Sequence, residues 1–149
     1  MKEFYTDDYK SLIRKSLLSQ TQRAFSNYGM WKDTKIFTTS LDCGRQTGKT
    51  NAIVSLSGEL SGVVIYVGHN LQAAEYFKEL GGRASIYTSK STVDHKLRGN
   101  RIAGNQITMI FDECDLTTTD MFKVAHSAAG AMIGNGTWGK YVHVIRLGM

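Results

Sequence analysis

Two apolar runs constrain the fold of this 149-residue sequence more than any other feature. They are Val63-Val-Ile-Tyr-Val67 and Gln106-Ile-Thr-Met-Ile-Phe111. Each has the length of a strand and few polar side chains, which is typical of central parallel strands covered on both faces. Segments with helical patterns lie between the strand-like segments. This alternation predicts an α/β fold with a mostly parallel sheet.

Local patterns predict the remaining elements of what we expect to be a single domain over residues 1–149. Thr6, followed by Asp7 and Asp8, is expected to cap the first helix, and the segment 1–32 to pack on the core. Residues 89–105 are polar and are expected to be irregular. Helices are predicted over 6–27, 49–60, 71–80 and 118–132, and further strands over 36–39, 84–88 and 141–147.

The composition argues against a membrane-spanning or disulfide-rich protein and leaves a nucleic-acid-binding protein open. The chain has 18 basic and 13 acidic residues, a net charge of +5, which fits a polyanionic partner without requiring one. It has no apolar run long enough to span a membrane and no apolar signal core, so we expect a cytoplasmic protein without a membrane partner. Cys43 and Cys114 form neither a disulfide framework nor a metal set.

The segment from Thr34 to Thr50 has the layout of a phosphate-binding loop. A β-rich run leads into a glycine-containing turn, which ends in Gly48-Lys49-Thr50 before a helix-like stretch. The full pattern, G-x-x-x-x-G-K-[ST], places its first glycine where this chain has Cys43. The alternative is a strand–turn–helix connection with a chance G-K-T. The predicted nucleotide-binding residues are Cys43, Gly44, Arg45, Gln46, Thr47, Gly48, Lys49 and Thr50.

These residue types suit the binding of ATP with Mg²⁺. Gly48 lets the backbone turn its N–H groups toward an anion, and the following helix directs the positive end of its dipole to the phosphates. Lys49 supplies a cation for the outer phosphates, and the Thr50 hydroxyl can ligate Mg²⁺. Gln20 or Gln22 of the first helix is a weaker candidate for bordering the adenine.

The second apolar run delivers Asp112 and Glu113 to the carboxyl end of its strand. Ligands of open α/β sheets bind at that edge. Asp112 is predicted to hold Mg²⁺ with Thr50, and Glu113 to activate a water as general base. The alternative is that Asp112 caps the next turn and Glu113 is solvated. Adjacent carboxylates favour a hydrolase over a small phosphotransferase.

The segment Gly44–Thr50 resembles the deviant Walker A loop of phage terminase large subunits, an R-Q-x-G-K-T form without the first glycine. Leu97-Arg-Gly-Asn100 resembles the R-G-x segment that precedes Walker B in those ATPases. Residues 63–74 resemble the strand-then-turn motif shared by terminases and superfamily-2 helicases. The resemblance covers roughly residues 34–148, and the matching segments follow one another in the same order as in the family.

This resemblance implies a three-layer, RecA-like P-loop NTPase, with Tyr141–Leu147 central between the Walker A and Walker B strands. It implies a phage-encoded, Mg²⁺-dependent ATPase that acts on DNA in packaging or translocation, in the host cytoplasm. By position, Lys49, Arg45 and Glu113 would be catalytic, and Thr50 and Asp112 would bind the metal. His69 and Asn70 would couple nucleotide state to DNA, and Arg98 and Arg101 could contact its phosphates.

The chain departs from this family at its far end. Relatives carry a Thr/Ser-rich coupling motif after the strand that follows Walker B, whereas this chain has Val144-Ile-Arg-Leu-Gly-Met149, where Arg146 is a possible substitute. We also expect no nuclease domain and no second lobe within this sequence. We therefore expect a homo-oligomer or partner chains that supply them. The alternative function is a nucleotide-binding regulatory module without significant turnover that works through a partner protein.

Overall fold

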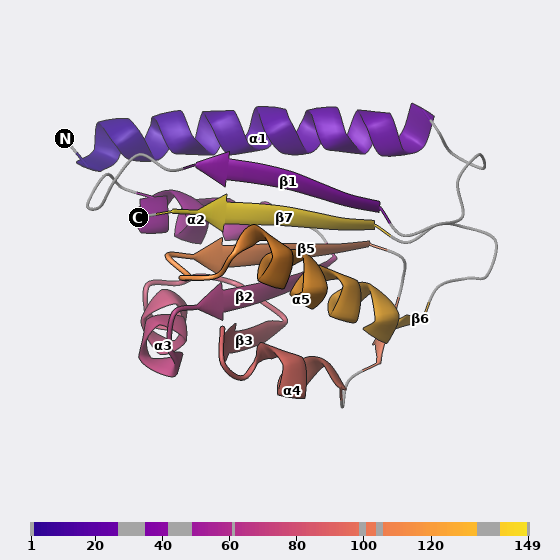
Figure 1. Cartoon of the computed structure of the whole chain (residues 1–149). Helices are drawn as coiled ribbons and strands as arrows, with labels where there is room; N and C mark the ends of the chain where they lie inside the picture. The colour runs from indigo at the N-terminus through magenta and orange to yellow at the C-terminus, as the bar shows by residue number, and fades with distance from the viewer. Residues whose placement is uncertain are drawn as a thin grey trace.

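The computed structural model describes residues 2–26, 35–41, 49–60, 62–98, 101–103, 106–133 and 141–148. Within these ranges five parallel strands form one sheet in the order β1-β7-β5-β2-β3 (Figure 1). The predicted α/β class with a parallel sheet is thereby confirmed. The elements are α1 (Lys2–Ser26), β1 (Lys35–Leu41), α2 (Lys49–Ser57), β2 (Val63–Gly68), α3 (Leu71–Glu79), β3 (Ile86–Ser89), α4 (Val93–Arg98), β4 (Ile102–Ala103), β5 (Gln106–Asp112), α5 (Thr118–Ala131), β6 (Met132–Ile133) and β7 (Tyr141–Leu147).

Strand β7 lies between β1 and β5, as predicted for Tyr141–Leu147. It pairs in parallel with β1 on one side and with β5 on the other, and all its residues except Arg146 are buried. The register aligns Leu147 with both Leu41 and Asp112. The carboxyl ends of these three strands therefore meet at one edge of the sheet.

Helices cover both faces of the sheet and create three layers (Figure 1). One core lies between the sheet and α1, α2 and α3, and contains Ile13, Ile53 and Phe77. The other lies against α4 and α5 and contains Leu97, Met121 and Ala125. Among the described helices, none is long and apolar enough to cross a membrane.

Two local predictions were wrong. The first helix begins at Lys2, so Thr6 lies inside it and is not its cap. Residues 2–5 are compatible with helix, and Glu3 suits a first turn. The segment 89–105, expected to be irregular, contains α4 and β4. Helix α4 has only two buried residues, Val93 and Leu97, which are too few to produce a recognisable helical period.

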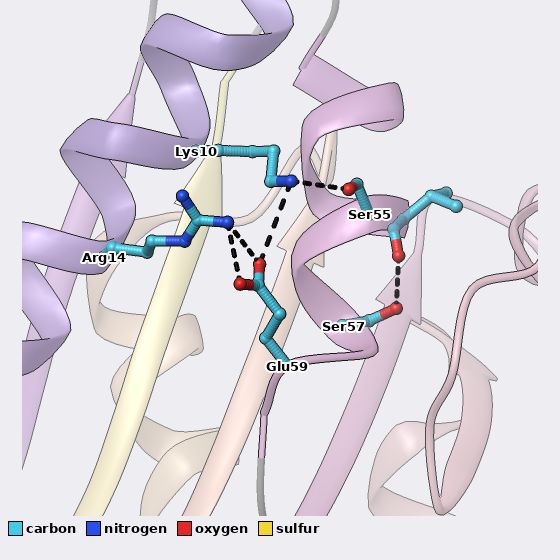
Figure 2. Close-up of polar contacts among 6 residues, drawn as sticks. Lys10, Arg14, Ser55, Ser57 and Glu59 are labelled. Carbon is cyan, nitrogen blue, oxygen red and sulfur yellow. Dashed lines mark hydrogen bonds and ion pairs between the residues drawn. The ribbon is translucent and has the colours of Figure 1, made fainter.

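Helix α1 is joined to the end of α2 by polar contacts as well as by its buried residues. Figure 2 shows Arg14 directed at the Glu59 carboxylate, which accepts two hydrogen bonds of 2.7 and 2.6 Å. Lys10 donates to the Ser55 hydroxyl at 2.7 Å. The bond from Arg14 lowers the pKa of Glu59. These exposed contacts join α1 to the end of α2, while the buried Ile13 supplies the apolar contact.

Two glycines provide a matched test of this packing. A Cβ at Gly82 would lie well inside van der Waals contact of three Phe77 ring atoms. That ring is fully buried and stacked on the ring of Tyr66, with 3.9 Å between the ring centroids. Displacing it would therefore disturb the packing of the core. We expect Gly82→Ala to lower the free energy of unfolding by about 1–3 kcal/mol. Gly130→Ala, in α5 with open space around its Cβ, should raise it by up to about 1 kcal/mol.

Urea unfolding of both variants beside the unsubstituted protein measures these changes. Equal free energies for the two substitutions would contradict the close packing of Gly82 on Phe77.

Candidate functional site

The carboxyl edge of the sheet brings together two residues that the sequence separates by 62 positions. Strand β5 ends at Asp112, and Thr50 lies in the first turn of α2. The Thr50 hydroxyl donates to Asp112 Oδ2 at 3.3 Å. The predicted phosphate-loop threonine and the predicted metal-binding carboxylate are therefore in contact.

The rest of the predicted loop falls outside the part of the chain that the structure describes. Lys49 is the first residue of α2, and its side chain is not described. The predicted binding residues outside the described ranges are Cys43, Gly44, Arg45, Gln46, Thr47 and Gly48. The described part of the site therefore consists of Thr50 together with the residues of β5, β2 and the loop after Asp112.

Asp112 is a buried carboxylate, with 5% of its surface exposed. Its Oδ2 also accepts a hydrogen bond of 2.7 Å from the Tyr66 hydroxyl of β2. Burial raises the pKa of Tyr66, and the charge of Asp112 raises it further, so this phenol remains a proton donor. Helix α5 is capped by Thr117, whose hydroxyl accepts from the Asp120 N–H at 3.1 Å.

The Thr50–Asp112 pair has the chemistry of a magnesium site. Mg²⁺ prefers hard oxygen ligands, and is commonly bound by one or two protein oxygens together with substrate phosphates and water. A hydroxyl and a carboxylate in contact at a strand end fit this requirement. The described residues contain no group of three or more His, Cys, Asp or Glu side chains suited to a metal. A site that completes its shell with phosphates does not need such a group.

Glu113 follows Asp112 in an unusual backbone conformation. Its φ is 53°, in the left-handed region that non-glycine residues rarely adopt. Its N–H donates to the Leu147 carbonyl of β7 at 2.8 Å, and its side chain is partly exposed. Strain of this kind often occurs at functional sites. The backbone thus turns sharply at the residue that was predicted to be the general base.

Comparisons with family models, curated proteins and solved structures find no match. The interpretation of this site therefore depends on its geometry and its residue chemistry. Sequence reasoning found Thr50, Asp112 and Glu113, but it missed Tyr66. The one signal was that Tyr66 is the only residue with a hydroxyl in the apolar run of β2.

Other predicted residues form no described contact with Thr50 or Asp112, although His69 and Asn70 follow β2 at the same edge of the sheet, where Gly68 pairs with Asp112. The Asn70 side chain accepts from the Ala73 N–H at 2.8 Å and so caps α3, while the neighbouring His69 is exposed. Arg98 and Arg101 are exposed and line an open cavity of about 400 Å³ beside the last turn of α5. Because α5 runs back from the Asp112 edge, this cavity lies toward the opposite edge of the sheet (Figure 1).

Gln20 has a packing role and is not available to border a nucleotide base. It is buried under α1, where its amide N–H₂ donates to the Thr39 hydroxyl at 2.9 Å and to the Ser16 hydroxyl at 3.2 Å. Its Oε1 lies 2.7 Å from His143 Nδ1. In this orientation the amide oxygen can only accept, so His143 carries its proton on Nδ1.

Cys114 lies partly buried at the end of β5, two residues after Asp112. Its thiol donates to the Val67 carbonyl at 3.1 Å. Burial and the negative charge of Asp112 raise the pKa of Cys114 to about 12. The thiolate, which is the nucleophilic form, is therefore scarce at neutral pH.

Proposed function

We propose that this protein is a Mg²⁺-dependent P-loop ATPase with RecA-like topology. The observation that carries the proposal is the contact between Thr50, directly after Gly48-Lys49, and Asp112, directly before Glu113. A chance G-K-T has no reason to lie beside a buried carboxylate at the carboxyl end of β5, which is separated from β1 by β7. The position of β7 between β1 and β5 supports the same topology.

The reaction follows from the roles of these residues. Glu113 accepts a proton from a water whose oxygen attacks the γ-phosphorus in line, and the bond to the β–γ bridging oxygen breaks to release ADP. Lys49 and Arg45 neutralise charge that develops on the γ-phosphate. Thr50 and Asp112 would hold Mg²⁺, which would supply positive charge to the phosphate oxygens. Tyr66 keeps Asp112 oriented through its hydrogen bond.

The substrate on which the ATPase acts is proposed to be DNA, in a phage-related packaging or translocation process. Support comes from the resemblance to terminases in residues 34–148 and from the net charge of +5. We also propose that the protein assembles into an oligomer or with partner chains. An arginine from a neighbouring subunit would then be available to stabilise the transition state.

ATP binding and phosphate release test this proposal. We expect the protein to bind ATP with Mg²⁺ and to release phosphate faster when duplex or single-stranded DNA is present. Lys49→Ala should weaken ATP binding at least tenfold, because it removes the cation that contacts the outer phosphates. Lys123→Ala, an exposed lysine of α5, is the matched control and should bind normally.

The outcomes separate the candidate functions. ATP binding of wild-type strength in Lys49→Ala would contradict a phosphate-binding loop. Tight binding without phosphate release under any condition would instead favour a nucleotide-binding regulatory module.

A further inference from the structure

The loop that carries Glu113 from β5 to α5 is anchored mainly by the end of β7. The Glu113 N–H donates to Leu147 O at 2.8 Å, and Arg146 Nη2 donates to Leu116 O at 3.2 Å. The remaining anchors are the Cys114 thiol on Val67 O and the Thr117 cap of α5. Two consecutive residues of β7 thus hold both ends of a four-residue segment from Glu113 to Leu116.

Arg146 is suited to this role by its position and its charge. It is the one residue of β7 that is not fully buried, and its register partners are Phe111 of β5 and Ser40 of β1. No described carboxylate forms an ion pair with its guanidinium. Its charge is therefore directed to a backbone carbonyl. A hydrogen bond from a charged donor contributes more than one between neutral groups.

The segment needs such support because Glu113 has a φ of 53°. The left-handed conformation is unfavourable for a non-glycine residue, and it persists only where neighbouring contacts enforce it. Leu147 holds the backbone at Glu113 itself. Arg146 restrains the other end of the segment, at Leu116.

The same end of β7 also reaches the other half of the site. The Gly148 N–H donates to Leu41 O at 2.7 Å, where β1 ends before the G-K-T segment. Arg146 and Leu147 of β7, with the following Gly148, therefore connect the strand that enters the phosphate loop with the segment that carries the proposed base.

We propose that Arg146 is a positioning residue that holds the Glu113–Leu116 segment through the Leu116 carbonyl and so keeps the Glu113 carboxylate aligned for hydrolysis. This inference rests on the proposed ATPase function. It gives Arg146 a role at the place where terminase-like ATPases carry a hydroxyl-rich motif.

The test compares Arg146→Met, which keeps a long stem without charge or donors, with Arg146→Lys, which keeps both. We expect Arg146→Met to lower kcat roughly tenfold, because small displacements of a catalytic group have large effects on rate. The KM for ATP should change less than about twofold, since the binding residues are elsewhere. Arg146→Lys should recover part of the loss. Arg83→Met, an exposed arginine before β3, is the matched control.

A double substitution distinguishes positioning from a general structural role. If Arg146 acts through Glu113, then Arg146→Met should cause no further loss of kcat in a Glu113→Gln background. Equal fold losses in both backgrounds would overturn the proposal, as would an unchanged kcat in Arg146→Met.

Amide hydrogen exchange over residues 113–117 tests the contact without ATP. Exchange should be faster in Arg146→Met than in the unsubstituted protein and Arg83→Met. A protein that releases no phosphate would overturn the ATPase function and the catalytic role of Arg146 with it. The exchange rates would still report whether Arg146 holds the segment, and unchanged rates would show that it does not.

Discussion

Replacement of Glu113 by glutamine is expected to abolish ATP turnover and to leave ATP binding intact. Glutamine has the same shape as glutamate but cannot accept the proton of the attacking water. Loss of a general base costs typically 10²–10⁴-fold in rate, so phosphate release should fall by at least 100-fold. Thr50 and Asp112 remain in contact, so the affinity for ATP with Mg²⁺ should stay within a few-fold.

Glu113→Gly is the informative companion to this substitution. It also removes the base, but it places the one residue that adopts a φ of 53° without steric cost. We therefore expect Glu113→Gly to lose turnover and to unfold at higher urea concentration, with a gain of up to about 1 kcal/mol. Glu113→Gln keeps the strain and should unfold like the unsubstituted protein.

Single-turnover phosphate release and equilibrium unfolding in urea measure the two effects separately. Wild-type release from Glu113→Gln would show that another group activates the water. A lower free energy of unfolding for Glu113→Gly would mean that contacts of the Glu113 side chain stabilise the fold by more than its backbone conformation costs.

Features encoded by local runs of residues could be predicted from the sequence. The apolar runs of β2 and β5 indicated buried parallel strands, and burial of Ile65 and Ile107 agrees with this. The contact of Thr50 with Asp112 followed from two motifs placed at the ends of parallel strands, which meet at one edge. The central position of β7 came from the resemblance alone, because no local pattern distinguishes a central strand from a neighbouring one.

Contacts between distant polar residues could not be predicted. Tyr66 meets Asp112 across 46 positions, and Gln20 meets His143 across 123. Both pairs are buried polar groups whose partners are specified only by the fold, and each residue is unremarkable within its own segment. The bond from Arg146 to Leu116 is of the same kind, because its acceptor is a backbone carbonyl that any residue could supply.

His143 is expected to make the stability of the fold depend on pH between about 4 and 6.5. Only 2% of its surface is exposed, and it packs between Phe37 and Tyr141 under α1. Burial lowers the pKa of His143 from 6.5 to about 4. Its Nε2 has no hydrogen-bond partner among the described residues, so a proton there would be a buried charge without compensation.

The direction of the effect follows from proton binding by the two states. Below pH 6.5 the unfolded chain protonates this histidine, whereas the folded protein does so only near pH 4. Lowering the pH through this window therefore favours unfolding. The full stability is present above pH 6.5, and about 3 kcal/mol is lost by pH 4, at 1.36 kcal/mol for each unit of pKa difference.

Urea unfolding at several pH values between 7 and 4 should show this loss in the unsubstituted protein and a much smaller loss in His143→Gln. The slope with pH is the readout, because the substitution also changes the absolute stability through the bond to Gln20. Because the pKa of Glu59 is lowered in the folded protein, protonation of Glu59 also reduces stability at the acidic end of this range. This contribution is the same in both proteins and cancels in the comparison. His126→Gln, an exposed histidine of α5, controls for removal of a histidine as such. Parallel pH curves for His143→Gln and the unsubstituted protein would show that His143 can accept a proton without opening the contact between α1 and the sheet.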